Sequence, residues 1–390
     1  MIAPIWKKLS NSGRQSLSLL LFSILFCLFN LLSNLSHAQT KRIAVVANGL
    51  NPFESISVVN LDHPDLKKAV QQDLIKLGQT PNDIQIDGQL AYVVNTNDNH
   101  IQIIDLKSEA NVGQISTGAN SLPEKIALLS DQYAYVTLNG SDGVAFIDLK
   151  AQTVLQTIKV GSKPWGVTIL DRKVYVTNSA AVWDGNQMSY DQSSVSIIDT
   201  QSNQVIQTIE VPINATGITT NGIDKVLVVS TGDYAQALGY LTIINHVDNA
   251  IEKKISLKTT PGAIAVNRSQ RKAYILSTTG WTITGAMVVD LAKRRVVIKA
   301  NEALPAFSGG FGMVFDHQSQ HFFVAVPDWS GGGQDQLRKI SSDGQEITSY
   351  AVGKGASFVA VADINGEHQI SVRPTGLHLP YLWGEIRKAR

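Results

Sequence analysis

Cysteine is almost absent from this sequence of 390 residues, in which Cys27 is the only one. Cys27 lies in an apolar stretch near the N-terminus, so the rest of the chain has no thiol. That part therefore has no disulfide, no thiolate nucleophile and no covalent attachment point for a c-type haem. The Gly-x-Ser-x-Gly motif, which presents the nucleophile of many serine hydrolases, is absent as well.

Charge is also sparse, because only 17% of the residues are Asp, Glu, Lys or Arg. Beyond residue 38 the chain has 30 Lys and Arg against 32 Asp and Glu, a formal charge of −2. Nucleic-acid-binding domains are usually distinctly basic, which argues against nucleic acid as a partner. Short basic groups at Arg271-Lys272 and Lys293–Arg295 are interpreted as solvated strands and turns.

The N-terminus has the pattern of a targeting segment. Lysines and an arginine precede an apolar run over residues 17–32, and the small residues Ser36 and Ala38 follow it. This order predicts that residues 1–38 are a signal peptide, cleaved before Gln39. We therefore expect a periplasmic or secreted protein. The alternative is an uncleaved N-terminal anchor, which would be the only contact with a membrane.

The strongest signal in the chain is a short repeat. Its clearest copy is Tyr175-Val176-Thr177-Asn178, and related segments precede and follow it. A second β-branched run comes after each copy, usually ending in Asp or Asn, as at Asp105, Asp148 and Asp199. Successive ends lie 43 to 51 residues apart. Such a period indicates a repeat architecture, and four short β-segments per repeat favour a propeller over a sandwich. The closing Asp or Asn is expected to accept backbone N–H bonds in the next turn.

These segments resemble the YVTN β-propeller repeat family. The resemblance implies an all-β, seven-bladed propeller of four-stranded blades over residues 39–375, followed by a C-terminal tail over 376–390. The first repeat lacks its inner strand, so we expect the C-terminal segment Ser357–Ala362 to supply it and close the ring. An additional β-segment at Gln369–Val372 leaves eight blades as the alternative.

Loop length predicts which face of the ring binds a ligand. In a propeller, the connections between the second and third strands emerge on the same face as the connections between blades. Long examples are residues 179–192, 231–237, 278–284 and 327–334, together with the blade connection 301–310. Binding residues usually collect on loops of a rigid scaffold.

Aromatic residues and acids concentrate in these loops. The candidate ligand-binding residues are Trp183, Tyr190, Tyr234, Trp281, Asp328 and Trp329. Stacking and polar contacts of this kind suit a protein, peptide or glycan ligand. The competing interpretation is that the aromatic side chains pack the loops. We expect a monomeric binding or scaffold protein outside the cytoplasm.

The alternative function is a metal-dependent hydrolase or lactonase with a cation at the channel mouth. Asn82, Asp83 and Glu124 are near the connections between blades, but their spacing is not diagnostic. His317 and His321 flank a turn, where exposed residues are a better interpretation than a zinc pair. No catalytic residue, metal ligand or cofactor is assigned.

Overall fold

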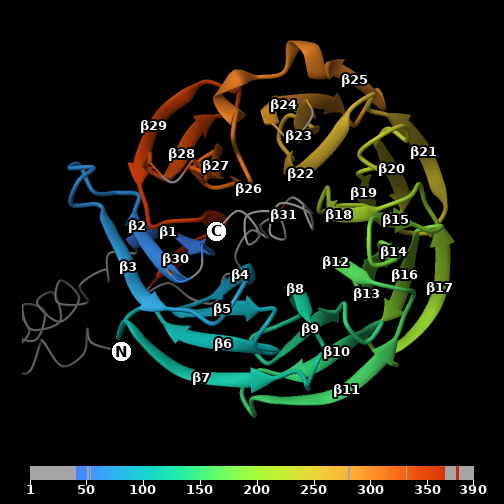
Figure 1. Ribbon diagram of the computed structural model, residues 1–390, viewed down its shortest axis with the longest axis horizontal. Helices are drawn as coiled ribbons and strands as arrows, with labels where there is room; N and C mark the ends of the chain where they lie inside the picture. The colour runs from blue at the N-terminus through green and yellow to red at the C-terminus, as the bar shows by residue number, and fades with distance from the viewer. Residues whose placement is uncertain are drawn as a thin grey trace, which may run out of the picture. The chain divides into compact units, whose positions relative to one another are not determined.

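The computed structural model describes residues 41–50, 52, 54–279, 282–330, 332–364 and 375–376. The predicted signal peptide, Trp281 and the segment Gln369–Val372 lie outside the described residues. From Lys41 onward the chain forms seven antiparallel sheets arranged as blades around a central channel (Figure 1). In the described part of the chain no helix is long and apolar enough to cross a membrane.

Each blade has four strands, which we call A to D from the channel outward, and in blade 7 a further short strand, β31 (Thr375–Gly376), pairs with the inner strand. The A strands of blades 1 to 7 are β30 (Ala356–Ile364), β4 (Pro81–Asp87), β8 (Pro123–Leu128), β12 (Pro164–Leu170), β18 (Ala215–Thr220), β22 (Thr260–Asn267) and β26 (Gly312–Asp316). The B strands are β1 (Lys41–Asn48), β5 (Leu90–Asn95), β9 (Tyr133–Leu138), β13 (Lys173–Asn178), β19 (Lys225–Ser230), β23 (Lys272–Thr279) and β27 (His321–Val326). The C strands are β2 (Ser55–Asn60), β6 (His100–Asp105), β10 (Gly143–Asp148), β16 (Ser194–Asp199), β20 (Tyr240–Asn245), β24 (Thr282–Asp290) and β28 (Gln336–Ser341). The D strands are β3 (Val70–Lys76), β7 (Ala110–Ser116), β11 (Thr153–Lys159), β17 (Gln204–Glu210), β21 (Ile251–Ser256), β25 (Arg295–Ile298) and β29 (Glu346–Ala351).

The ring is closed by a strand from the far end of the chain. Strand β30 pairs antiparallel with β1, with Val45 opposite Ala360 and Ile43 opposite Ala362. Blade 1 therefore combines one C-terminal strand with three N-terminal strands, as predicted. The described strands form seven blades, so the alternative of eight is wrong.

The repeated tetrapeptide connects strands and blades. In blade 4 the hydroxyl of Tyr175 lies 3.3 Å from Oδ1 of Asn249, in the C–D turn of blade 5. The amide of Asn178 donates to Ser194 and Ser196 on the neighbouring C strand, both at 2.9 Å. Tyr135 likewise reaches Asn203 in the next blade. The aromatic position thus joins neighbouring blades, and the amide fixes strand B to strand C.

The acids that end the C strands have the predicted local role. Oδ1 of Asp105 accepts bonds from the backbone N–H groups of Lys107 (2.8 Å) and Ser108 (3.1 Å). Asp148 accepts the same pair of bonds in blade 3. These bonds satisfy backbone donors in a tight turn and explain why Asp or Asn recurs there.

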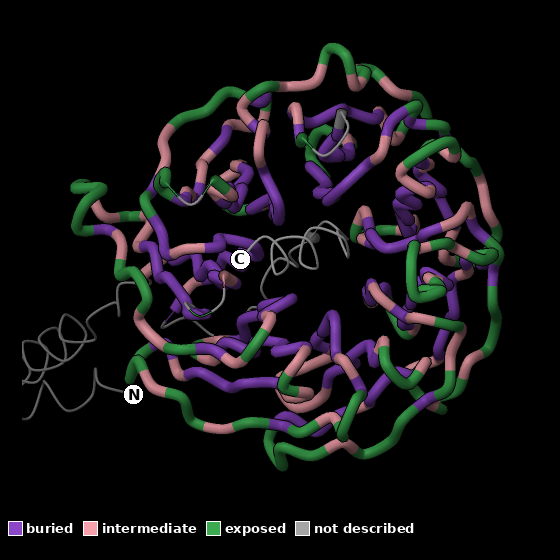
Figure 2. Tube along the Cα trace, in the orientation of Figure 1, coloured by how far each residue is buried: buried purple, intermediate pink, exposed green. Residues whose placement is uncertain are grey.

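Burial decreases from the channel outward, as Figure 2 shows for the inner and outer strands. Inner strands such as β4 and β8 are buried along their whole length, whereas the outer strand β7 is mostly exposed. Side chains from neighbouring blades form shared apolar clusters, one of which joins blades 2 and 3. Ring stability therefore depends on contacts between adjacent blades.

Two segments predicted as loops are folded differently. Residues 278–284 mostly extend β23 and β24, with Thr279 opposite Thr282, so the prediction of a long loop there is wrong. The β-branched residues of this segment favour a strand. Residues 301–310 contain two short 3₁₀ helices, η1 (Ala300–Glu302) and η2 (Pro305–Phe307). Phe307 is fully buried and packs on Tyr274 and Phe322, so it belongs to the core.

Candidate functional site

The loops that were predicted to be long lie on one face of the ring. In blades 1 to 5 the B–C connection bonds to the connection that enters the same blade, as between the Ser179 N–H and the Lys163 carbonyl (3.0 Å). Thr231 and Asn214 make the equivalent bond in blade 5, at 2.8 Å. A–B and C–D turns are joined in the same way on the opposite face, as between Leu106 and Gln89. The long loops therefore share one face.

A small hairpin projects Trp183 from blade 4. It consists of β14 (Ala181–Trp183) and β15 (Met188–Tyr190), and its turn is held by Oδ1 of Asp184, which accepts two backbone N–H bonds at 2.8 Å. These bonds lower the pKa of Asp184. The Trp183 residue is 53% exposed, which is a large fraction for tryptophan. The hairpin thus presents an exposed aromatic side chain on a hydrogen-bonded support.

Tyr190 and Tyr234 lie side by side between blades 4 and 5. Their ring centroids are 6.4 Å apart, so the hairpin of blade 4 rests against the B–C loop of blade 5. Tyr234 has a φ of 63°, a left-handed conformation that bulky residues rarely adopt. Burial, with a smaller contribution from Tyr190, raises the pKa of Tyr234. The loop is secured by Asp233, which accepts bonds from the N–H groups of Ala235 and Ala237.

Asp328 and Trp329 have mainly structural contacts. Both oxygens of Asp328 accept bonds within its own loop, from the Ser330 N–H and hydroxyl and from the Gly333 N–H. The ring of Trp329 packs edge-on against Phe311, with centroids 5.9 Å apart, and it borders the apolar core. These two half-buried candidates hold the loop of blade 7 in place.

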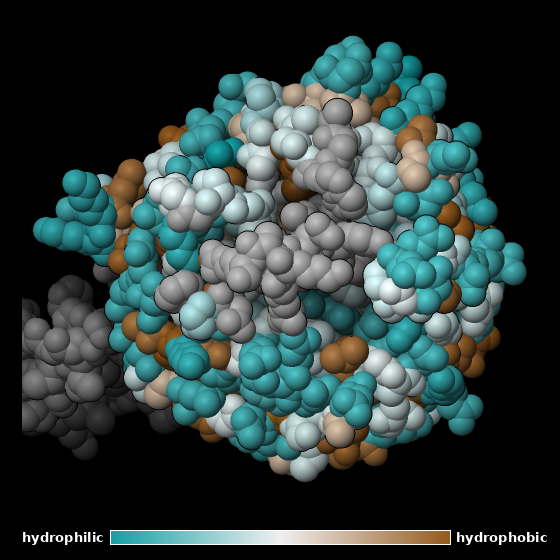
Figure 3. Space-filling view, in the orientation of Figure 1, coloured by the Kyte–Doolittle hydropathy of each residue, from teal (hydrophilic) through white to brown (hydrophobic). Residues whose placement is uncertain are grey.

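Among the six candidates the structure brings Trp183, Tyr190 and Tyr234 to one region, at the hairpin of blade 4. Asp328 and Trp329 are on the same face but belong to blade 7. Trp281 lies outside the described residues. Figure 3 shows a ring surface that is mostly hydrophilic, with scattered hydrophobic side chains.

The polar residues considered for a cation site at the channel mouth form hydrogen bonds with their neighbours. Asn82 donates its amide to Oε2 of Glu124 at 2.7 Å, and the ammonium group of Lys125 bonds to the backbone carbonyl of Asn82. Burial raises the pKa of Glu124 to about 8. A neutral carboxyl beside an ammonium group does not favour a cation. Within the described residues, no group of three or more His, Cys, Asp or Glu side chains is arranged to hold a metal ion.

A cavity of about 280 Å³ lies at the other end of the channel, away from the long loops. It is lined by residues from the C-terminal halves of A strands and from the A–B turns that follow them. Its polar lining residues are Gln85, Thr168, Thr219, Thr220, Arg268 and His317. His317 lies in the turn after β26, as expected, but it is half-buried and not exposed, because its ring packs edge-on against Phe315 with centroids 5.0 Å apart.

One sequence signal pointed to this cavity and was missed. Arg268 directly follows β22 and His317 directly follows β26, so the two residues occupy equivalent positions in blades 6 and 7. Aligning the repeats on the ends of their A strands would have placed both side chains at the same end of the channel.

Comparison with known proteins supports the architecture. No family model and no curated protein sequence matches the chain. The fold is similar to that of a functionally unknown protein from Desulfotomaculum acetoxidans, with a TM-score of 0.59 and 15% identity, over 83% of this chain and 99% of that one. It is also similar to Kuenenia stuttgartiensis hydrazine synthase (TM-score 0.57, 14% identity, 74% of this chain and 94% of that one). Apo AztD from Citrobacter koseri matches with a TM-score of 0.50 and 11% identity, over 84% and 99% of the two chains. At these identities the likeness concerns the fold alone.

Proposed function

We propose that this chain is an extracytoplasmic binding protein that engages a protein, peptide or glycan on its long-loop face. The observation that carries the proposal is the exposed Trp183, held on a hairpin that packs through Tyr190 against Tyr234. Rigid aromatic side chains lose little entropy on binding and provide a large contact area. The unusual backbone of Tyr234 supports the same region, since such conformations cluster at functional sites.

Trp183→Ala is expected to weaken ligand binding at least about tenfold, as removal of an aromatic anchor does. Stability should change by less than about 1 kcal/mol, because most of the residue is in solvent. Binding is measured on a glycan array and against a displayed peptide library, with affinities for the hits determined by calorimetry. Leu155→Ala is the matched control, because Leu155 is similarly exposed (52%) on the outer strand β11.

Equal affinity of wild type and Trp183→Ala for every hit would exclude the hairpin from the binding surface. A large fall in melting temperature for Trp183→Ala would instead assign the side chain to packing. Trp329→Ala serves as the contrasting variant. Its contact with Phe311 predicts a loss of about 2 to 4 kcal/mol of stability.

The proposed location rests on the N-terminal segment. Expression in a Gram-negative host is expected to give a periplasmic protein whose first residue is Gln39, because the small residues before it match the signal peptidase specificity. Intact-mass measurement of the fractionated protein checks this. An uncleaved chain in the membrane fraction would instead support the anchor, and an uncleaved chain in the cytoplasm would contradict both.

A further inference from the structure

The channel end opposite the long loops has the composition of an anion site. Its cavity contains one arginine, one histidine, three threonines and a glutamine, and none of the described residues that line it is acidic. Apolar side chains from the A strands, among them Leu128, Ile169 and Phe315, form the rest of the wall. Polar atoms make up the larger part of the exposed lining, and a concave site on which such groups converge beside apolar side chains can hold a small polar molecule.

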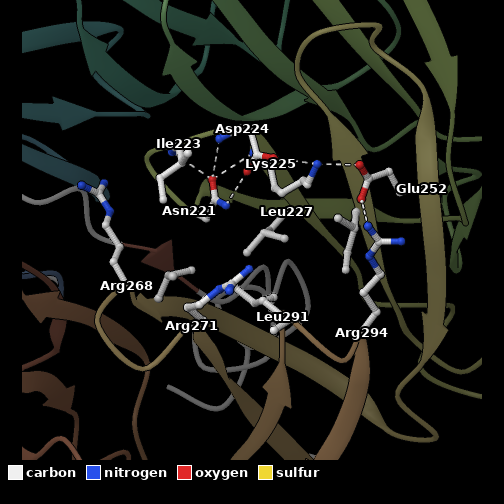
Figure 4. Close-up of a pocket in the computed structure, with 13 residues that line it drawn as sticks. Asn221, Ile223, Asp224, Lys225, Leu227, Glu252, Arg268, Arg271, Leu291 and Arg294 are labelled. Carbon is white, nitrogen blue, oxygen red and sulfur yellow. Dashed lines mark hydrogen bonds and ion pairs between the residues drawn. The ribbon is translucent and has the colours of Figure 1, made fainter.

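Arg268 supplies the positive charge. Within the described part of the chain no carboxylate forms an ion pair with its guanidinium group. Figure 4 shows Arg268 at the edge of a neighbouring cavity, on the opposite side from Glu252, which pairs with Lys225 and with Arg294. Asp224, which lines that neighbouring cavity together with Arg268, pairs with Lys225 at 2.8 Å, so the Arg268 charge remains available to a ligand.

The position of Arg268 is set by a glycine. A Cβ atom on Gly222 would lie 2.4 Å from Cζ of Arg268, so the guanidinium group packs directly over the glycine backbone. Gly222 has a φ of 73°, and its N–H bonds to the Thr220 hydroxyl at 3.0 Å. The A–B turn of blade 5 therefore provides the surface on which the arginine of blade 6 packs.

His317 is a neutral donor beside this charge. Burial, with a further contribution from Arg268, lowers the pKa of His317 to about 4. The residue is fixed on both sides, by the Phe315 ring and by a bond from the Gln320 amide to its backbone carbonyl. At neutral pH the imidazole can therefore donate one N–H to an anion without adding charge.

We propose that this end of the channel binds a small organic carboxylate, with the carboxylate at Arg268 and His317 and the apolar part against the A-strand wall. The planar guanidinium group matches a carboxylate through two parallel hydrogen bonds. The threonine hydroxyls, which can donate or accept, fit the remaining polar positions. A volume near 280 Å³ is at the small end for ligand pockets and suits a compact molecule.

The test uses benzoate as a carboxylate probe and inorganic phosphate as the competing anion, with the purified full-length protein in calorimetry. Benzoate is expected to bind with a Kd of about 1 mM or below. Arg268→Gln should weaken it about tenfold or more, as loss of a charged hydrogen bond does. Arg271→Gln is the matched control, since it removes the same charge three residues away and should leave the affinity within about twofold.

A second measurement does not depend on folding of the arginine variant. The imidazole proton resonance of His317, assigned by its loss in His317→Gln, is expected to shift when benzoate is added to the wild type. Equal affinity of Arg268→Gln and wild type, or no binding up to about 10 mM benzoate, would overturn the site. Phosphate binding more tightly than benzoate would overturn the carboxylate assignment.

Discussion

Arg42→Ala is expected to lower the free energy of unfolding by about 3 kcal/mol, the scale measured when one partner of a buried ion pair is removed. Arg42 is on β1, and its Nε donates to Oδ2 of Asp316 in blade 7 at 3.0 Å, with a second contact from Nη2 to Oδ1. Its Nη1 lies 2.8 Å from Asp363 on β30. The Asp316 side chain is only 1% exposed, so the variant would leave a buried carboxylate without its cation.

The position of this ion-pair cluster adds to the expected loss of stability. Arg42, Asp316 and Asp363 lie where the last blade meets the first, so they join the two ends of the ring. Burial opposes ionisation of Asp316, but the bonds from Arg42 and Ser319 outweigh it and lower its pKa. The stabilisation is therefore present above the unfolded pKa of about 3.9 and is lost as the pH falls through the lower folded value.

Urea unfolding at pH 7 measures the effect, with Lys41→Ala as a control on the same strand. The double variant Arg42→Ala with Asp316→Asn should recover part of the loss, because it removes both charges. A cost below about 1 kcal/mol for Arg42→Ala would place these residues among ordinary surface ion pairs.

Glu124→Gln is expected to stabilise the protein at high pH by about 5 kcal/mol. Glu124 is buried on the inner strand β8, and burial raises its folded pKa from 4.5 to about 8. Between these values the folded protein holds a proton that the unfolded chain has lost, so stability falls as the pH rises, by about 1.4 kcal/mol per pH unit. Glutamine keeps an oxygen that can accept the Asn82 bond and does not ionise.

Unfolding curves at pH 5, 7 and 9 check this prediction. The two proteins should be nearly equally stable at pH 5 and should diverge toward pH 9. Glu302→Gln is the matched control, because it is the same substitution at an exposed position, where it should change stability little. Parallel curves for wild type and Glu124→Gln would show that the carboxyl is ionised in the folded state.

The fold was largely predictable because the residues that define each repeat make contacts with nearby parts of the chain. The acids ending the C strands bind their own turns, as at Asp105, and the repeat amide binds its neighbouring strand, as at Asn178. Ring closure is predictable from the number of strands, because the first repeat lacks its inner strand and the C-terminal region contains an additional one. These features depend on short-range contacts or on strand number, and a sequence records both.

The site was less predictable because it depends on side-chain direction across the channel. Sequence pattern placed aromatic residues in loops, but it did not separate the exposed Trp183 from Trp329, which packs on Phe311. Arg268 and His317 are 49 residues apart and come together only because neighbouring A strands end at the same height. Whether two such side chains face the same cavity depends on how all the blades are arranged around the channel.

Closure by β30 also has a consequence for biosynthesis. Strands β1 and β30 are more than 300 residues apart, so the first blade cannot be completed until nearly all of the propeller has been synthesised. Until then β1 has an unpaired edge, which is a template for intermolecular association. Distant pairings of this kind slow folding and lengthen the exposure of intermediates. The nascent ring therefore depends on protection from aggregation until its last strand arrives.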